Sequence, residues 1–247
     1  MTSELADFTT FHLGGPAVNL HIAETRDELV EFSRDHPLSL SARENADVLF
    51  IGGGSNLLIS DDGFAADVCV VATKGVTMTE TSETETRVTA EAGENWDEFV
   101  AFTLDRGLAG LEALSGIPGS VGATPIQNVG AYGTEVAELI TSVEVFDRLA
   151  GQVRHLSAVE LEFGYRTSAL KRAQQRTGSA QYLVLSVTFD LHRSPDSLPV
   201  RYAQLASALD VEIGDTVPAT QVRSSVISLR RSKGMVVDPG DHDTWSA

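Results

Sequence analysis

Residues 47–59 read DVLFIGGGSNLLI, a stretch in which two apolar runs flank three consecutive glycines and a Ser-Asn pair. Neither of the two common phosphate-binding loops fits it. A dinucleotide fingerprint would need a third glycine at Leu57 or Leu58, and a Walker loop would need a Lys-Ser/Thr pair after its last glycine. Residues 57–60, followed by DDG at 61–63, predict a short strand and a turn instead of a helix. The predicted order is therefore strand, glycine loop, strand.

The glycine loop has two possible explanations. Consecutive glycines adopt backbone angles closed to other residues, so the N–H groups of Gly52, Gly53 and Gly54 can converge on an anion. A tight turn without a ligand explains the same residues equally well, because a glycine cluster is a weak signal. Taken alone, the segment leaves both explanations open.

Composition restricts the class of protein. The chain has 247 residues, 42% of them hydrophobic, which suffices for a sizeable core in one large or two modest domains. Its single cysteine, Cys69, lies in an apolar run and is expected to be a buried strand residue. A disulfide framework and a cysteine metal site are thereby excluded. The six histidines lack close metal-ligand spacing, so we predict no metal site.

Charge and hydropathy limit the partners. The chain carries 35 acidic and 18 basic residues and a formal charge of −17, which disfavours non-specific binding of nucleic acid. Residues 1–15 have neither a basic segment nor an apolar core, and no apolar run is long enough to span a membrane. We expect a cytoplasmic protein without membrane insertion or a nucleic-acid partner, and we expect a monomer.

Periodicity and capping signals predict a first α+β unit over residues 1–74. Residues 17–22 alternate like a strand, and Thr25 opens a helix with the spacing of a capping box. Further strands at 48–51 and 68–73 flank the glycine loop. The order of elements in this unit is β-α-β-β.

The same signals predict a second unit over residues 75–234. The elements expected in it are a strand at 87–93, a helix at 95–107 between the N-cap Asn95 and the stop Gly107, strands at 143–147 and 182–191, and a helix at 220–234 between the N-cap Thr220 and the stop Gly234.

The most informative stretch is GLEALSGIPGSVGATPIQNVGAYG, residues 110–133, with six glycines and two prolines. Such a loop cannot fill a core, because its buried N–H and C=O groups would need partners. A long extended ligand would supply them. The polar side chains available to such a ligand are Ser115, Ser120, Thr124, Gln127, Asn128 and Tyr132. A functionless surface loop is the alternative, but long loops are usually functional or disordered, and the apolar residues here argue against disorder.

Four motifs together resemble a known family. IGGGSN at 51–56, the stretch at 110–133, FGYRTS at 163–168 and VISLRRSK at 226–233 occur in this order, and TTFHLGGPA at 9–17 matches as well. They resemble the UDP-N-acetylenolpyruvoylglucosamine reductases, bacterial flavoenzymes. The resemblance implies an α+β chain with the FAD-binding fold of the vanillyl-alcohol oxidase type, in which the flavin lies between two α+β subdomains.

The resemblance also implies a tightly bound FAD, held mainly by backbone amides of two glycine loops. The cofactor-binding residues that it assigns are Gly52, Gly53, Gly54, Ser55, Asn56, Gly116, Ile117, Pro118, Gly119, Ser120, Gly122, Ala123, Gln127, Asn128, Gly130 and Ala131.

The reaction implied has two halves: NADPH reduces the flavin, and the flavin passes hydride to the enolpyruvyl group of a UDP-sugar, giving UDP-N-acetylmuramate. This serves peptidoglycan synthesis, and hence cell wall biogenesis, cell shape and cell division. Arg166 matches the family's catalytic arginine that faces the substrate carboxylate, a role suited to a guanidinium that is always charged and grips both oxygens. Tyr132, Tyr202 and Lys233 match substrate-binding residues, the last of them at the diphosphate.

The family pattern continues beyond a segment like DPGDHDTWSA, residues 238–247, into Gly-Ser-Phe-Phe, whose serine donates a proton. This sequence ends at Ala247. We therefore expect residues 235–247 to begin a substrate-binding domain whose C-terminal part is missing here. Two alternatives stay open: a catalytically incomplete fragment that binds flavin or a nucleotide, and another oxidoreductase on the same flavin fold.

Overall fold

The computed structural model describes residues 4–38, 48–238, 240, 241 and 244. Parts of the stretch at 235–247, expected to begin a further domain, therefore lie outside the described residues. The α-helices are α1 Arg26–Asp35, α2 Trp96–Asp105, α3 Ala158–Leu161, α4 Ala169–Thr177, α5 Ala203–Leu209 and α6 Ala219–Arg231. The strands are β1 Ala17–Ala23, β2 Val48–Ile51, β3 Phe64–Val71, β4 Val76–Glu80, β5 Glu85–Glu91, β6 Leu108–Ala109, β7 Gly130–Ala131, β8 Thr134–Glu135, β9 Ile140–Asp147, β10 Gln152–Ser157 and β11 Tyr182–Arg193.

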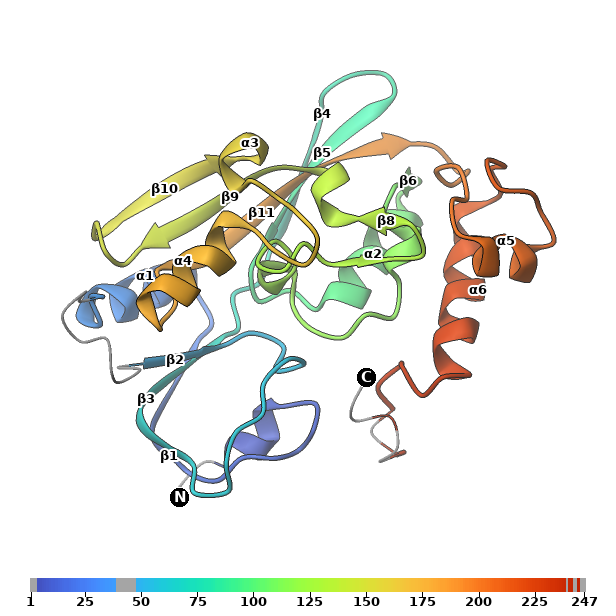
Figure 1. The fold of residues 1–247 in the computed structure, drawn as a ribbon. Helices are drawn as coiled ribbons and strands as arrows, with labels where there is room; N and C mark the ends of the chain where they lie inside the picture. Colours follow the sequence, from blue (N-terminus) through green and yellow to red (C-terminus); the bar gives the residue numbers. More distant parts are fainter. Residues whose placement is uncertain (1–3, 39–47, 239, 242–243, 245–247) are drawn as a thin grey trace.

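The N-terminal part forms a three-stranded parallel sheet in the order β1-β3-β2 (Figure 1). Helix α1 lies between β1 and β2 in the chain and begins at the predicted capping box, in which Thr25 and Glu28 bond reciprocally to each other's backbone N–H groups. The predicted order of strand, helix, strand, strand is confirmed. Cys69 is a fully buried residue of β3, as expected.

The strand predicted at residues 57–60 is wrong. This segment belongs to the connection between β2 and β3, which are parallel and therefore need a crossover. Its apolar residues pack without strand pairing: Ile59 is buried in a cluster with Leu5, Ile51 and Val68. The apolar run that suggested a strand reflects this packing.

The larger part of the chain forms a six-stranded antiparallel sheet in the order β10-β9-β11-β5-β4, with the short β6 also paired to β11. Helix α2 packs its apolar face here, where Trp96 and Phe99 contact Phe189 of β11. Its predicted N-cap is confirmed, because the Asn95 side chain accepts a hydrogen bond from the N–H of Glu98. The main hydrophobic cluster also includes Ala23 and other residues of the first sheet and α1, so one core joins both sheets.

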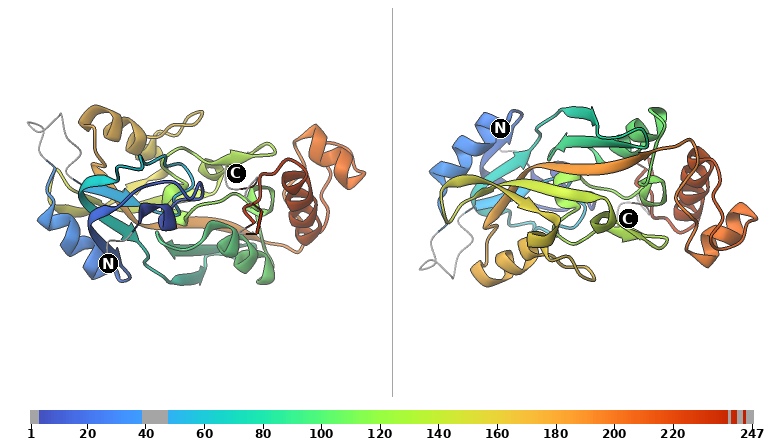
Figure 2. Two further views of the ribbon diagram at one scale, coloured as in Figure 1. Left: turned by 90° about the horizontal axis from the view of Figure 1, so that it is seen from below. Right: turned by 90° about the horizontal axis from the view of Figure 1, so that it is seen from above.

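Helices α5 and α6 form a helical module at one end of the molecule, opposite α1 (Figure 2). They have a hydrophobic cluster of their own, which includes Leu205, Val222 and Val226. The segment at 110–133 lies between this module and the two sheets (Figure 1). The module therefore presents one face of α6 to the glycine-rich loop.

Helix α6 ends as predicted but begins differently. Gly234 has φ +66°, and the N–H groups of Gly234 and Met235 bond to the carbonyls of Arg231 and Arg230, the pattern of a Schellman motif. The N-cap is Pro218, not the predicted Thr220. The first helical N–H, that of Ala219, donates to the Pro195 carbonyl, so a long-range contact replaces a side-chain cap.

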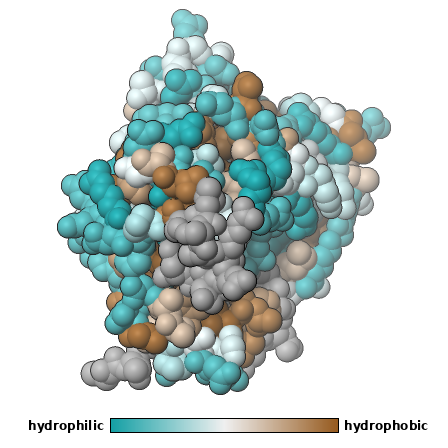
Figure 3. Space-filling view, turned by 60° about the vertical axis from the view of Figure 1, so that its left-hand side comes forward, coloured by the Kyte–Doolittle hydropathy of each residue, from teal (hydrophilic) through white to brown (hydrophobic). Residues whose placement is uncertain are grey.

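The surface shown in Figure 3 is mainly hydrophilic, with apolar residues in small separate patches. None of the helices in the described part of the chain has the length and apolar composition needed to cross a bilayer.

Candidate cofactor-binding site

Two glycine loops from different parts of the chain meet at this site. The first comprises residues 52–56 and the second residues 116–122. A Cβ atom built on Gly53 would lie 2.5 Å from both Cα and the carbonyl carbon of Gly119, and one on Gly52 would lie 2.6 Å from Ser120 Oγ. The Ser55 hydroxyl donates across the contact to the Pro118 carbonyl at 3.1 Å. The loops therefore touch backbone to backbone, which only glycine permits at this distance.

The second loop is seated on the start of α2. The N–H of Trp96 donates to the Gly119 carbonyl at 3.1 Å, and the N–H of Val121 donates to the Glu94 carbonyl at 2.8 Å. A Cβ on Gly122 would lie 2.5 Å from the Cβ of Ala92, so this glycine also permits a close approach. The loop is thus held by main-chain bonds, independently of any ligand.

Several amides at the contact donate to no protein group. Within the described part of the chain, this is true of the N–H groups of Gly53, Gly54, Ser55 and Asn56 in the first loop and of Gly119 and Ser120 in the second. An anionic group is the natural partner for a set of unbonded amides on glycine-rich backbone. The chemistry of the loops is therefore compatible with an anionic group such as a pyrophosphate.

A cleft of about 820 Å³ opens beside the loops. The predicted site residues that line it are Ser55, Asn56, Ile117, Pro118, Ser120, Ala123, Gln127, Asn128, Gly130, Ala131, Tyr132, Arg166, Tyr202 and Lys233. A smaller pocket of about 120 Å³ lies between the two sheets. Its walls include Gly52, Gly122 and apolar residues such as Phe50 and Leu183, and Ser120 and Ala123 border both spaces. Among the predicted residues, Gly53, Gly54, Gly116 and Gly119 line neither space.

Arg166 lies in a tight turn with unusual backbone geometry. Gly164 and Thr167 exchange two main-chain hydrogen bonds of 3.0 and 3.1 Å, and Arg166 between them has φ +49°. Two other residues of the cleft, Asn128 and Tyr132, also have positive φ, at 48° and 50°. Left-handed backbone is uncommon for such residues and concentrates at functional sites. The ammonium group of Lys171 donates to the Arg166 carbonyl at 3.0 Å and to Gln127 Oε1 at 3.3 Å, which holds the turn against the loop.

The Asn128 side chain is committed to the protein. Its amide donates to Glu135 at 2.7 Å and to the Gly164 carbonyl at 3.1 Å, and its oxygen accepts from the N–H of Ala137 at 3.1 Å. No amide hydrogen remains for a ligand. Asn128 therefore fixes the turn of Arg166, and its predicted contact with the cofactor depends on the remaining oxygen lone pair or on its backbone.

The helical module supplies the opposite wall. The ring of Tyr202 meets that of Tyr132 edge to face, with centroids 5.7 Å apart, and Lys233 Nζ donates to Gln204 Oε1 at 2.9 Å. The guanidinium of Arg230 is buried and donates from Nε to the Gly116 carbonyl at 3.0 Å. Burial lowers the pKa of Arg230, but an arginine stays charged at neutral pH.

Arg166, Arg230 and Lys233 thus bring three cations to a cleft in a protein of charge −17. The described residues contain no group of three or more His, Cys, Asp or Glu side chains that could hold a metal ion. Sequence reasoning gave Arg230 no role of its own, although it lies in the motif at 226–233, and did not foresee Trp96, Gln204 or Lys171 at the site. Gln204 and Lys171 lie close in the chain to Tyr202 and Arg166, but no motif marked them, and Trp96 reaches the cleft from a separate element, α2.

Comparison with known proteins identifies the class. A family model described as FAD binding domain matches residues 23–157, more than half of the chain, which therefore belongs to this FAD-binding family. The chain is 50% identical over 243 residues to the UDP-N-acetylenolpyruvoylglucosamine reductase of Thermobifida fusca, and 48% identical over 245 residues to that of Saccharopolyspora erythraea. These matches cover 98% and 99% of this chain, and they confirm the resemblance drawn from the motifs. The chain spans 65% and 64% of the length of these two relatives.

Solved structures support the fold. The crystal structure of UDP-N-acetylenolpyruvylglucosamine reductase from Thermus caldophilus matches with a TM-score of 0.60 and 27% identity, covering 95% of this chain and 69% of that one. A cholesterol oxidase from B. sterolicum matches with a TM-score of 0.50 at 13% identity, covering 74% of this chain and 36% of that one, and shows likeness of fold alone. The predicted FAD-binding fold of the vanillyl-alcohol oxidase type is confirmed.

Proposed function

We propose that this chain provides the FAD site and the substrate cleft of a UDP-N-acetylenolpyruvoylglucosamine reductase, which reduces UDP-N-acetylglucosamine enolpyruvate to UDP-N-acetylmuramate with NADPH. The observation that carries the proposal is the meeting of two glycine loops with unbonded amides beside a cleft lined by Arg166, Arg230 and Lys233. The high identity to reductases of this name supports the choice of substrate.

The residues present fit a dinucleotide flavin. Free amides on both loops suit its pyrophosphate, and the apolar pocket of about 120 Å³ beside them suits one end of the molecule. The larger cleft then receives the other end together with the substrate. FAD bound there would supply the hydride chemistry that side chains lack.

The cations have separate tasks in this proposal. Arg166 binds the carboxylate of the enolpyruvyl group through two parallel hydrogen bonds and stabilises the negative charge that develops there during reduction. Asn128 and Lys171 hold its turn, so the guanidinium is positioned before the substrate arrives. Lys233 binds the diphosphate, which must displace the bond from Lys233 to Gln204. Tyr132 and Tyr202 close the cleft over the sugar nucleotide.

An anaerobic absorbance experiment on the purified chain tests the proposal. We expect the chain to bind FAD. The absorbance of the flavin at about 450 nm should bleach when NADPH is added, as is common for flavoenzymes. The absorbance should recover when the enolpyruvyl substrate is added. The variant Arg166→Lys keeps a charge but loses the bidentate fork, so bleaching should persist while recovery slows.

Flavin that bleaches but never recovers would show a cofactor-binding unit without this reductase activity. Absence of flavin binding would refute the cofactor assignment. The division at residues 74 and 234, a monomeric state, a cytoplasmic location and the peptidoglycan pathway are further parts of the proposal.

A further inference from the structure

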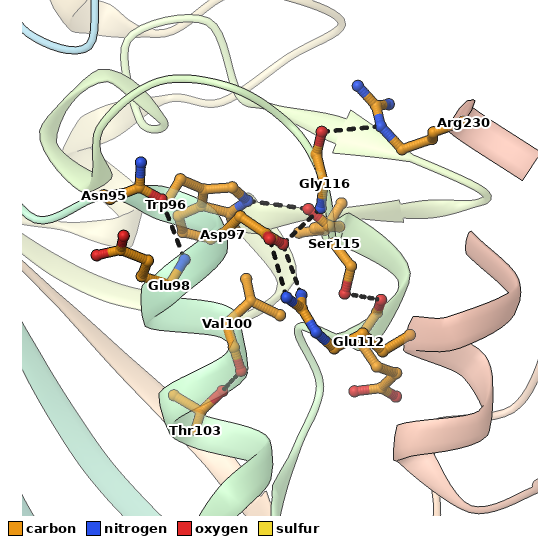
Figure 4. Close-up of polar contacts among 12 residues, drawn as sticks. Asn95, Trp96, Asp97, Glu98, Val100, Thr103, Glu112, Ser115, Gly116 and Arg230 are labelled. Carbon is orange, nitrogen blue, oxygen red and sulfur yellow. Dashed lines mark hydrogen bonds and ion pairs between the residues drawn. The ribbon is translucent and has the colours of Figure 1, made fainter. Parts of the chain in front are cut away.

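Asp97 connects three elements around the cleft (Figure 4). It is the second residue of α2, next to the buried Trp96, whose indole N–H donates to the Leu114 carbonyl at 3.0 Å. Its carboxylate accepts the N–H of Gly116 at 2.6 Å and the two terminal nitrogens of Arg223 at 2.5 and 2.8 Å. One side chain thus bonds the start of the second glycine loop and helix α6 at once.

A second bond closes the connection. Arg223 and Arg230 lie two turns apart on one face of α6, and Arg230 Nε donates to the carbonyl of Gly116. Both main-chain polar groups of Gly116 are therefore hydrogen-bonded, the N–H to Asp97 and the C=O to Arg230. Its φ of +72° is one that a glycine adopts without strain.

The carboxylate of Asp97 is ionised in this arrangement. Burial opposes ionisation, but the hydrogen bonds from Arg223 and from the Gly116 N–H outweigh it and hold the pKa of this carboxyl below its usual value. Charge-assisted, bidentate bonds of this kind are directional, so they define the position of the guanidinium as well as attracting it. The ion pair between Asp97 and Arg223 is therefore better suited to fixing the position of α6 than to stabilising the fold alone.

The position of α6 matters because Arg230 lies in its last turn and Lys233 follows just after its end, and both residues line the cleft. Its distance from the second glycine loop determines how far these cations stand from a cofactor held by that loop. We infer that Asp97 is a positioning residue, which fixes the second glycine loop to α6 and thereby places Arg230 and Lys233 relative to the cofactor. This inference rests on the proposed function for the identity of the cofactor.

The chain offers a matched control for this ion pair. Arg87 and Asp190, on neighbouring strands β5 and β11, form a bidentate pair with distances of 2.8 and 2.7 Å, and neither residue lines the cleft. Asp190→Asn removes the same charge from the same kind of pair. Any effect of Asp97→Asn that Asp190→Asn lacks therefore belongs to the position of Asp97.

The first measurement is amide hydrogen exchange on the ligand-free chain. We expect Asp97→Asn to speed exchange of the Ser115 and Gly116 amides at the start of the second glycine loop and of α6 by about tenfold or more, the loss of one charge-assisted bond, while Asp190→Asn leaves both segments unchanged. The variant Arg223→Gln should speed exchange in α6 more than in the loop, because Asp97 can still accept the Gly116 N–H. Unchanged exchange of both segments in Asp97→Asn and Arg223→Gln would overturn the inference.

The second measurement uses FAD as the probe. Asp97→Asn should raise the Kd of FAD by about tenfold and alter the visible circular dichroism of the flavin at saturation, which reports the surroundings of the ring. A purely stabilising role would lower the melting temperature and leave the saturated spectrum as in the wild type, and that result would also overturn the inference. If the wild-type chain binds no FAD, the proposed function fails, and the hydrogen-exchange comparison alone decides the role of Asp97.

Discussion

Replacing Gly53 by alanine tests whether the two glycine loops touch as closely as the structure shows. The new Cβ would lie 2.5 Å from two backbone atoms of Gly119 and 2.9 Å from the nitrogen of Ser120. Gly53 is not among the residues with positive φ, so its own backbone accepts alanine. The whole effect of the substitution therefore comes from the contact between the loops.

The size of the effect follows from that contact. Ordinary van der Waals separation begins at 3.4 Å, so the loops must part by about 0.9 Å. No side-chain rotation can relieve a clash with backbone atoms, and overpacking of this kind costs about 1–3 kcal/mol of the free energy of unfolding. The same opening moves the free amides of the first loop away from those of the second. Loss of one hydrogen bond to a charged phosphate, about 1.5–3 kcal/mol, would raise the Kd of FAD roughly ten- to a hundredfold.

The assay is a fluorescence titration with FAD combined with thermal unfolding. Gly52→Ala is the control one residue away, because its Cβ would meet only the Ser120 side chain, whose hydroxyl lies 2.6 Å off and can rotate. We expect Gly52→Ala to lower the melting temperature less than Gly53→Ala does. Equal FAD affinity and equal melting temperature in Gly53→Ala and the wild type would refute the contact and its role in binding.

Three further predictions concern other residues. Arg166→Gly and Arg166→Ala should both abolish binding of the enolpyruvyl substrate, measured by flavin absorbance. Only glycine adopts φ +49° without strain, so the free energy of unfolding of Arg166→Gly should exceed that of Arg166→Ala by about 1 kcal/mol. Equal free energies of unfolding would contradict the strain. Burial alone would lower the pKa of His36, but hydrogen bonds to the Phe32 carbonyl and to Asp67 raise this pKa above 6.5. The protonated imidazole therefore stabilises the folded state fully below pH 6.5, and this contribution is lost as pH rises through the folded-state pKa. In urea unfolding at several pH values, the free energy of unfolding of the wild type should exceed that of His36→Gln by an amount that shrinks above pH 6.5. A difference that grows with pH would disprove the pairing of His36 with Asp67. Trp96→Phe leaves the Leu114 carbonyl without its indole donor and should cost about 1–3 kcal/mol in chemical denaturation, whereas a neutral result would argue against that bond.

Local signals in the sequence predicted local structure well. The N-caps Thr25 and Asn95 bond to backbone groups three residues away, so the determinants of these helix starts lie within one turn. The start of α6 was missed because the Pro195 carbonyl, which receives the first helical N–H, lies more than twenty residues earlier in the chain. Residues 57–60 misled for a related reason, since burial of Ile59 in a cluster leaves the same apolar pattern as a strand does.

The candidate site was predicted in part. The glycine loops, Arg166 and Lys233 were found because their motifs are contiguous in the sequence, and the structure brings them to one cleft. The bonds that hold them were not found. Asp97 and Arg223 are far apart in the chain, and no motif near either residue indicates which residue it pairs with.

The sequence by itself determined the class of fold, the family resemblance, the N-caps of α1 and α2 and the presence of two glycine-rich loops, because each depends on residue type and short spacing. Only the tertiary structure decided that Gly53 lies against Gly119, that the Asn128 side chain is used up by protein partners, and that α6 carries Arg230 to the cleft. The physical reason is that these contacts form when distant segments pack around one core. Their geometry is then a property of the packed chain and not of any local stretch.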